Sequence, residues 1–148
     1  MQTLIRPVTP PDIPALRQML QALSDHDGGT HPVGSEAALC NAAFHTHLIH
    51  ALIHPQGMVI YYPDFSTHRG QPGLYVQDLY VAPEARGTGL ARALVAATIA
   101  HQTWNAEYIC LGVSPSNTQA TRFYTKCGFT FRGYEMMILE SPAMEDLT

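Results

Sequence analysis

The pattern of apolar and polar positions predicts a strand, a turn and a helix in the middle of the chain. Leu74 to Val81 is rich in β-branched and aromatic residues, as in a largely buried strand. Pro83 should end this strand, because proline has no N–H to donate to a neighbouring strand. After a glycine-bearing turn, apolar residues recur near the 3.6-residue period of a helix, at Leu90, Leu94, Val95, Thr98 and Ile99.

The N-terminal third predicts one strand and two helices. We expect the strand at Thr3 to Arg6. The first helix should be capped by Asp12 and end before Asp25, with a buried face formed by Ile13, Leu16, Leu20 and Leu23. The second should begin at Ser35-Glu36, with Ser35 as its cap. Its end is open, because the apolar residues of the segment 46–53 continue the helical spacing.

The remaining segments predict a loop, further strands and one more helix. Asp64 to Gly73 holds glycine, proline, serine and threonine and is typical of a loop. Tyr108 to Val113 is apolar, as in a central strand, and Asn105 before it is suited to a left-handed helix cap. Asn117 should cap a helix that Gly128 ends, with Ala120, Phe123, Tyr124 and Cys127 on its inner face. Phe129 to Glu140 should supply a last strand or pair of strands.

Length and composition predict a single domain, residues 1–148, in the cytoplasm. The sequence has no run of 18 apolar residues, so we expect no transmembrane helix. The first residues lack the apolar core of a signal peptide. The three cysteines are widely spaced, as in small buried apolar residues of a reducing compartment. A net charge of −4 argues against a nucleic-acid partner, which would select a basic surface.

Four of the eight histidines lie close together, at positions 45, 47, 50 and 54. A metal site is conceivable if the segment is helical, because His50 and His54 would then share one face. No clear third ligand accompanies that pair, so we expect no metal.

The turn after the central strand predicts an anion site. A strand, a glycine turn and a helix start direct several backbone N–H groups to one point, where the helix dipole adds partial positive charge. A phosphate group is therefore the expected ligand. The turn lacks the lysine of a P-loop, and Arg92 stands where a dinucleotide-binding fingerprint has its third glycine.

Two motifs resemble those of the GCN5-related N-acetyltransferase (GNAT) superfamily. Arg86-Gly87-Thr88-Gly89-Leu90-Ala91 resembles the pyrophosphate loop, Gln/Arg-x-x-Gly-x-Gly/Ala, and follows a matching Asp-Leu-Tyr-Val-Ala-Pro-Glu. Asn117 to Phe129 resembles the second signature, Asn-x-x-Ala-x-x-Phe-Tyr-x-x-x-Gly-Phe. Two independent motifs in the expected order make chance agreement improbable.

This resemblance implies an α/β (α+β) fold with a mixed, mostly antiparallel sheet of six to seven strands and about four helices. It also favours a strand near Thr46 to Ile53, a turn at His54 to Gly57 and a strand at Met58 to Tyr62. Pro55 and Gly57 support that turn.

The resemblance also implies acetyl-CoA as donor and a primary amine as acceptor. Gln77 to Val81 and Phe65 to Thr67 look most like the branch with spermidine/spermine and thialysine N-acetyltransferases, in which homodimers are common. A small cationic amine is thus the expected substrate. The expected coenzyme contacts are Leu79, Tyr80, Val81, Arg86, Gly87, Thr88, Gly89, Leu90, Ala91, Arg92, Asn117, Ala120 and Tyr124. Tyr124 would protonate the leaving thiolate, because a phenol is protonated at neutral pH.

The general base stays open at this point. The branch carries glutamate where Gln77 stands, and simple alternation puts Asp78 on the other face of the strand. Gln77 is suited to orient a water, and a water chain to bulk solvent or a histidine is the alternative base. Gln77 and Asp78 are also expected to contact the substrate. Asp25 and Asp27 lie in an acidic turn that either attracts the ammonium group of the substrate or is simply solvated. Alternative functions are acetylation of a protein N-terminus or lysine, and acyl-CoA binding without catalysis.

Overall fold

Five strands form one sheet, in the order β1-β2-β3-β4-β5, within the described part of the chain. They are β1 (Arg6–Pro7), β2 (His50–His54), β3 (Gly57–Ser66), β4 (Gln71–Val81) and β5 (Ile109–Leu111). Neighbouring strands are antiparallel except β4 and β5, which run parallel. The mixed, mostly antiparallel sheet is confirmed, but with five strands rather than six or seven.

This computed structural model describes residues 4–29 and 32–148. The chain forms two compact units, Met1–Asn117 and Thr118–Thr148. The first contains the sheet and the helices α1 (Ile13–His26), α2 (Glu36–Phe44) and α3 (Leu90–His101), and the second contains α4 (Thr118–Cys127). The expectation of one domain stays a prediction. No helix of the described residues is long and apolar enough to cross a membrane.

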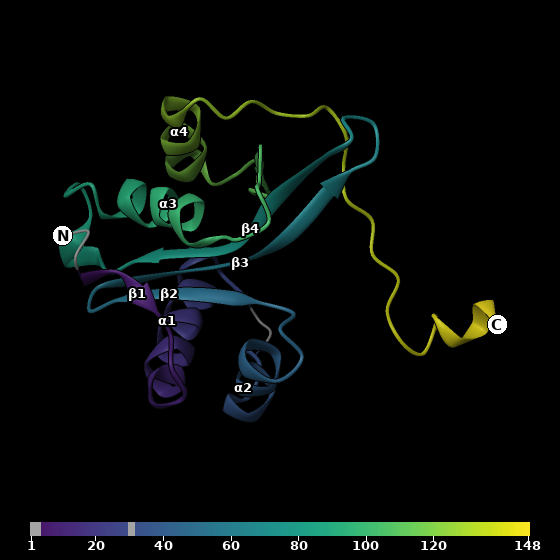
Figure 1. The fold of residues 1–148 in the computed structure, drawn as a ribbon, viewed down its shortest axis with the longest axis horizontal. Helices are drawn as coiled ribbons and strands as arrows, with labels where there is room; N and C mark the ends of the chain where they lie inside the picture. The colour runs from purple at the N-terminus through teal and green to yellow at the C-terminus, as the bar shows by residue number, and fades with distance from the viewer. Residues whose placement is uncertain (1–3, 30–31) are drawn as a thin grey trace. The chain divides into compact units, whose positions relative to one another are not determined.

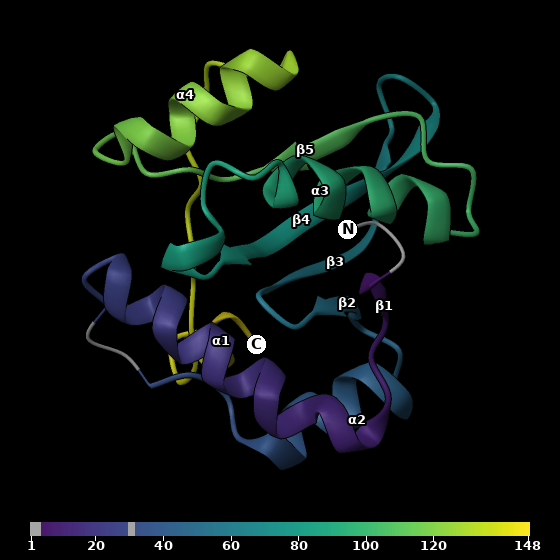
Figure 2. The same ribbon diagram turned by 90° about the vertical axis from the view of Figure 1, so that its left-hand side faces the viewer.

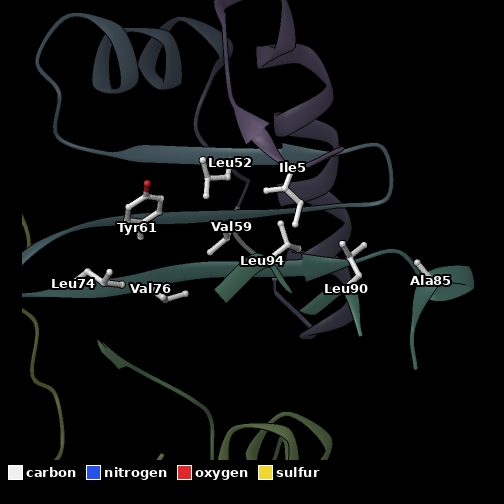
Figure 3. Packing of buried hydrophobic residues seen from close by; sticks show 9 residues of the cluster. All are labelled: Ile5, Leu52, Val59, Tyr61, Leu74, Val76, Ala85, Leu90 and Leu94. Atoms are coloured by element: carbon white, nitrogen blue, oxygen red, sulfur yellow. The ribbon is translucent and has the colours of Figure 1, made fainter. Parts of the chain in front are cut away.

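The sheet separates two apolar layers in the first unit. Figure 1 shows α3 on one face of the sheet and α1 and α2 on the other, and Figure 2 shows the same arrangement from the side. Because side chains alternate along a strand, Val59 and Tyr61 of β3 face α3, whereas Met58 and Ile60 belong to the opposite layer. Figure 3 shows the layer on the α3 side, which includes Leu52, Leu90 and Leu94.

The N-terminal expectations need three corrections. The first strand is Arg6–Pro7 and not Thr3 to Arg6; Thr3 lies outside the described residues. The Asp12 side chain does not cap α1, because it accepts hydrogen bonds from Arg6 at 2.6 and 2.8 Å and from the Thr9 N–H at 2.8 Å. The helix also continues to His26, so Asp25 lies in its last turn rather than beyond it.

Of the two alternatives for residues 46–53, a longer helix or a strand, the structure has the strand. α2 begins after Ser35, whose hydroxyl accepts the Ala38 N–H at 3.1 Å, and it ends at Phe44. The following strand begins at His50, later than expected. The predicted loop from Asp64 to Gly73 is wrong, because β3 and β4 stay paired as far as Ser66 opposite Gln71. Cross-strand pairing therefore shortens the connection to the turn 67–70.

The C-terminal expectations also change. The cap of α3 is Gln102, and Asn105 adopts the left-handed conformation, φ 57°, three residues later. The strand predicted at Tyr108 to Val113 is the shorter β5. The described structure has no strand between Phe129 and Glu140. Gly133 has φ 79° there, which interrupts an extended chain, and the neighbouring apolar side chains are exposed.

The unequal burial of two residues on α3 predicts that their replacement by alanine destabilises the protein to very different extents. Leu94 is fully buried against the sheet, whereas Ile99 is 54% exposed. Leu94→Ala should lower the free energy of unfolding by about 2–5 kcal/mol, because it opens a cavity in the core. Ile99→Ala removes the same number of carbon atoms and should cost less than about 1 kcal/mol. Urea denaturation followed by circular dichroism measures both, and equal losses would contradict this packing.

Candidate functional site

The edge of β4 is open beyond Val76. The parallel pairing with β5 ends at Val76 opposite Leu111, so among the described residues the rest of β4 has only β3 as a neighbour. The N–H of Ala82 donates to Gln56 on the β3 side at 2.8 Å. Because hydrogen-bonding groups alternate along a strand, the main-chain groups of Leu79 and Val81 point to the open side. The Val81 carbonyl accepts the Arg86 side chain there at 3.3 Å.

The turn after β4 ends in a left-handed glycine. Pro83–Ala85 form a short 3₁₀ turn, and the Thr88 hydroxyl donates to the Ala85 carbonyl at 2.5 Å. Gly89 is the N-cap of α3 with φ 89°, a conformation that residues with a Cβ rarely adopt. The main-chain bond from the Ala93 N–H to the Gly89 carbonyl, 3.0 Å, begins the helical ladder.

This turn has the geometry that the sequence predicts for an anion site. The N–H groups of Leu90 and Ala91 precede the first bond of the ladder, so they have no partner inside the helix. They lie where the dipole of the helix is positive. Thr88 and Gly89 immediately before them are exposed. The arrangement can therefore receive a phosphate group.

The second motif is described within its own unit. Gly128 follows α4 with φ 103°, and the Phe129 N–H donates to the Tyr124 carbonyl at 3.0 Å. The Tyr124 ring packs against Phe123, with ring centres 5.2 Å apart, and edge-on against Phe129 at 5.5 Å. Ala120 lies on the same helix, whereas Asn117 is the last residue of the first unit.

A β-bulge lies in β4 at Gln77 and Asp78, the two residues that the sequence analysis considered in the search for a general base. Ile60 is opposite Asp78 and Tyr61 is opposite Val76, so Gln77 is the extra residue. Gln77 is exposed and Asp78 is half-buried. The bulge interrupts the simple alternation that the sequence analysis assumed, and sequence alone gives no signal for it.

The surroundings of Asp78 raise the pKa of its carboxyl group, which makes the carboxylate a stronger base. Burial, and to a smaller extent the negative charge of Asp27, together raise the pKa of Asp78 to about 6. Asp27 is the residue that follows α1, and its N–H donates to the Leu23 carbonyl at 3.0 Å. Asp25 instead accepts the side-chain N–H of Gln21 at 3.0 Å. The structure thus brings Asp27, rather than Asp25, into electrostatic contact with Asp78.

The histidines do not converge on a common point. The His54 ring accepts the Gln56 N–H at 3.0 Å, and His50 stacks on Tyr61 with ring centres 5.6 Å apart. Among residues 4–29 and 32–148, no group of three or more histidine, cysteine, aspartate or glutamate side chains is placed to hold a metal ion.

Comparison with known proteins agrees with this geometry. The family model described as "Acetyltransferase (GNAT) family" matches residues 15–129. An uncharacterized N-acetyltransferase of Mycobacterium tuberculosis is 43% identical over 56 residues, 37% of this chain and 36% of that protein. A mycothiol acetyltransferase of Thermobispora bispora is 47% identical over 51 residues, 34% of this chain and 17% of that protein. These matches therefore span about a third or less of the curated relatives.

Solved structures share the fold. A crystal structure described as a probable acetyltransferase superposes with a TM-score of 0.74 and 21% identity, covering 93% of this chain and 99% of that one. At this identity the likeness concerns the fold alone.

The coupling between Asp27 and Asp78 predicts a specific change in titration. Asp27→Asn should lower the pKa of Asp78 from about 6, because the second negative charge is removed, while burial keeps it above the ordinary aspartate value. Asp25→Asn is the matched control and should leave the Asp78 titration unchanged. Carboxyl carbon chemical shifts measured by NMR against pH test this, and equal effects of the two variants would contradict the proximity of Asp27.

The same coupling fixes the sign of a stability effect. The pKa of Asp78 is higher in the folded than in the unfolded chain, so its contribution is fully present below the unfolded value, roughly 4, and is lost as pH rises through about 6. Asp78→Asn should therefore gain stability relative to the parent as pH rises from 4 to 8, measured by urea denaturation. A constant difference would contradict the raised pKa.

Proposed function

The chain belongs to the GNAT family of acetyltransferases, and we propose that it transfers an acetyl group from acetyl-CoA to a primary amine. The proposed acceptor is a small cationic molecule, a diamine, polyamine or amino-acid-like amine. The observation that carries this proposal is the turn between β4 and α3, where an open strand edge leads directly to a helix N-terminus. A homodimer and a cytoplasmic location, implied by the resemblance and by composition, stay predictions.

The residues along β4 and the turn fit an extended thioester ligand with a diphosphate. We assign the diphosphate to the main chain from Arg86 to Arg92, because the N–H groups of Leu90 and Ala91 have no partner inside α3 and a helix start favours anions. We assign the linear arm to the main-chain groups of Leu79 and Val81, which have no strand partner on their open side among the described residues. When bound, acetyl-CoA supplies the activated acetyl group. Tyr80, Asn117, Ala120 and Tyr124 complete the proposed contacts.

Asp78 is our candidate for the general base that the sequence leaves open. An ammonium group must lose a proton before its nitrogen can attack a carbonyl carbon. A carboxylate with a pKa near 6 is largely ionised at neutral pH, yet it is a stronger base than an ordinary aspartate. Asp27 adds a second negative charge to attract the cation. Gln77 then orients substrate or water, because an amide does not accept a proton at neutral pH.

Tyr124 is our candidate for the general acid. Its phenol is protonated at neutral pH, so it can donate to a thiolate as the carbon–sulfur bond breaks. The contacts of its ring with Phe123 and Phe129 hold the side chain within its own unit. Packing alone would need only the ring, whereas proton donation needs the hydroxyl.

A thiol-release assay with an amine panel tests the proposed reaction. Acetyl-CoA and the purified chain should release thiol when a diamine or polyamine is added. Asp78→Asn should lower kcat by roughly 10²–10⁴-fold, because the amide cannot take up the proton. Asp27→Asn should raise the KM for a diamine more than Asp25→Asn does, because Asp27 is the residue coupled to Asp78.

Each contrary outcome has a distinct meaning. Coenzyme binding without thiol release for any amine would replace the enzyme by an acyl-CoA sensor. Release with peptides alone would indicate acetylation of protein amines. Activity that persists in Asp78→Asn, with an unchanged pH profile, would remove Asp78 as the base without removing the acetyl transfer.

Replacement of Tyr124 by Phe separates acid catalysis from packing. Tyr124→Phe keeps the ring contacts and removes the hydroxyl, so kcat should fall, by ~10²–10⁴-fold if proton donation limits the rate, while the Kd for coenzyme A changes little. Tyr134→Phe is the matched control in the same unit, because Tyr134 is exposed and contacts Arg132. Steady-state kinetics and calorimetry measure the two quantities. A parallel loss of coenzyme affinity would instead show that the hydroxyl holds the ligand.

A further inference from the structure

A cavity lies at the edge of the sheet opposite to β5. It has a volume of about 250 Å³ and lies between the end of α2, the start of β2, the segment after β1 and the last residue of α3. β1 pairs with Leu52 and Ile53, and the Val8 N–H after it donates to the Ala51 carbonyl at 3.1 Å, so His50 at the start of β2 extends beyond this pairing. Its lining includes Ala43, Phe44, Ile49, His50, Leu52 and Tyr61.

Tyr61 directs a hydroxyl group into this cavity. The residue is 2% exposed, and its hydroxyl has no hydrogen-bond partner among the described residues. Among the described residues, no fully buried side-chain oxygen or nitrogen lacks a hydrogen-bond partner. The Tyr61 oxygen is therefore not fully enclosed, and it opens onto the cavity. Figure 3 shows the ring near Leu52, with the hydroxyl directed away from Leu74 and Val76. Burial raises the pKa of Tyr61 to about 12, so the hydroxyl keeps its proton and can donate it in a hydrogen bond.

Aromatic rings form one wall of the cavity. The His50 ring stacks on Tyr61 at 5.6 Å and lies 5.2 Å from the Trp104 ring. Trp104 is held in place, because its indole N–H donates to the Gly73 carbonyl at 2.7 Å. Burial lowers the pKa of His50, which favours a neutral imidazole at neutral pH. The His50 and Tyr61 rings therefore present flat, uncharged surfaces to the cavity, and Trp104 contacts His50 without lining it.

The cavity lacks the charges that an ionic ligand would need. Among the described residues, no carboxylate, lysine or arginine side chain lines it. The lining includes the imidazoles of His50 and His101 but, in the part of the chain that the structure describes, no acidic group, so a cation would lose its hydration there without a compensating partner. A cavity of roughly 150 Å³ suffices for benzene, so 250 Å³ has room for one ring with a short substituent.

We propose that this cavity binds a small uncharged ring compound, with one oxygen atom that accepts a hydrogen bond from the Tyr61 hydroxyl. The phenyl face lies against His50 and the aliphatic part against Ile49 and Leu52. The site is separate from the proposed coenzyme site, because His101 and Gly89 lie at opposite ends of α3, about 18 Å apart for a helix of this length. The proposal goes beyond acetyl transfer and does not depend on it.

Trp104 provides the test, because it is the single tryptophan of the chain and contacts His50. Titration of the full chain, without acetyl-CoA, with benzyl alcohol should change the Trp104 emission, and calorimetry should give the same Kd. Toluene, which lacks the oxygen, should bind more weakly by roughly two- to tenfold, the worth of one net hydrogen bond. In Tyr61→Phe this difference between benzyl alcohol and toluene should vanish.

Two further comparisons locate the site and its charge preference. Ala43→Leu fills the cavity and should abolish binding of both ligands, whereas Ala37→Leu, an exposed position of the same helix, should not. Thermal unfolding confirms that each variant is folded. Benzylamine should bind more weakly than benzyl alcohol. Equal binding of toluene and benzyl alcohol to the parent chain, unchanged binding in Ala43→Leu, or preference for benzylamine would each overturn the proposal.

Discussion

The loss of one neighbour along β4 is the constraint on which the proposed chemistry depends. A strand whose main-chain groups are unpaired must satisfy them with water or a ligand, because an unpaired buried N–H or C=O is costly. β4 is paired on both sides only as far as Val76, and then on the β3 side alone. The chain next enters a turn whose helix begins with unpaired N–H groups. An extended polar ligand that ends in phosphates matches both features at once.

Asp78 of β4 and Asp27 after α1 place negative charge where, in the proposed reaction, a cation would react. Burial and the charge of Asp27 both favour the neutral form of Asp78, so each raises its pKa. A bound ammonium group would oppose both effects, because it neutralises Asp27 and stabilises the Asp78 carboxylate. In the proposed reaction, the pair would therefore couple recognition of the amine to proton transfer. This coupling requires α1 to extend as far as His26, which places Asp27 directly after the helix.

The sequence predicts those parts of the fold that rest on local chemistry. Pro83 follows the end of β4, Gly89 precedes α3 and Gly128 follows α4, because the proline ring and positive φ are local constraints. Asn117 precedes the start of α4, as predicted. Features set by pairing between distant segments were missed. The bulge at Gln77 depends on the register with β3, and the long β3–β4 hairpin depends on pairs up to Ser66 and Gln71. A last strand or pair of strands was predicted for Phe129 to Glu140, but a strand also needs a neighbour to pair with, and the local sequence does not supply one.

The ring of Tyr61 packs well in the core, but its hydroxyl group has no hydrogen-bond partner among the described residues. Its ring fills the α3 side of the sheet among Leu52, Val59 and Leu74. Phenylalanine would make the same apolar contacts without a hydroxyl to satisfy. A buried hydroxyl that loses its partner costs about 1–3 kcal/mol, so the oxygen is tolerated because it opens onto the cavity beside His50. The shortness of β1 thus has a chemical consequence: it leaves a donor accessible at an otherwise apolar edge of the sheet.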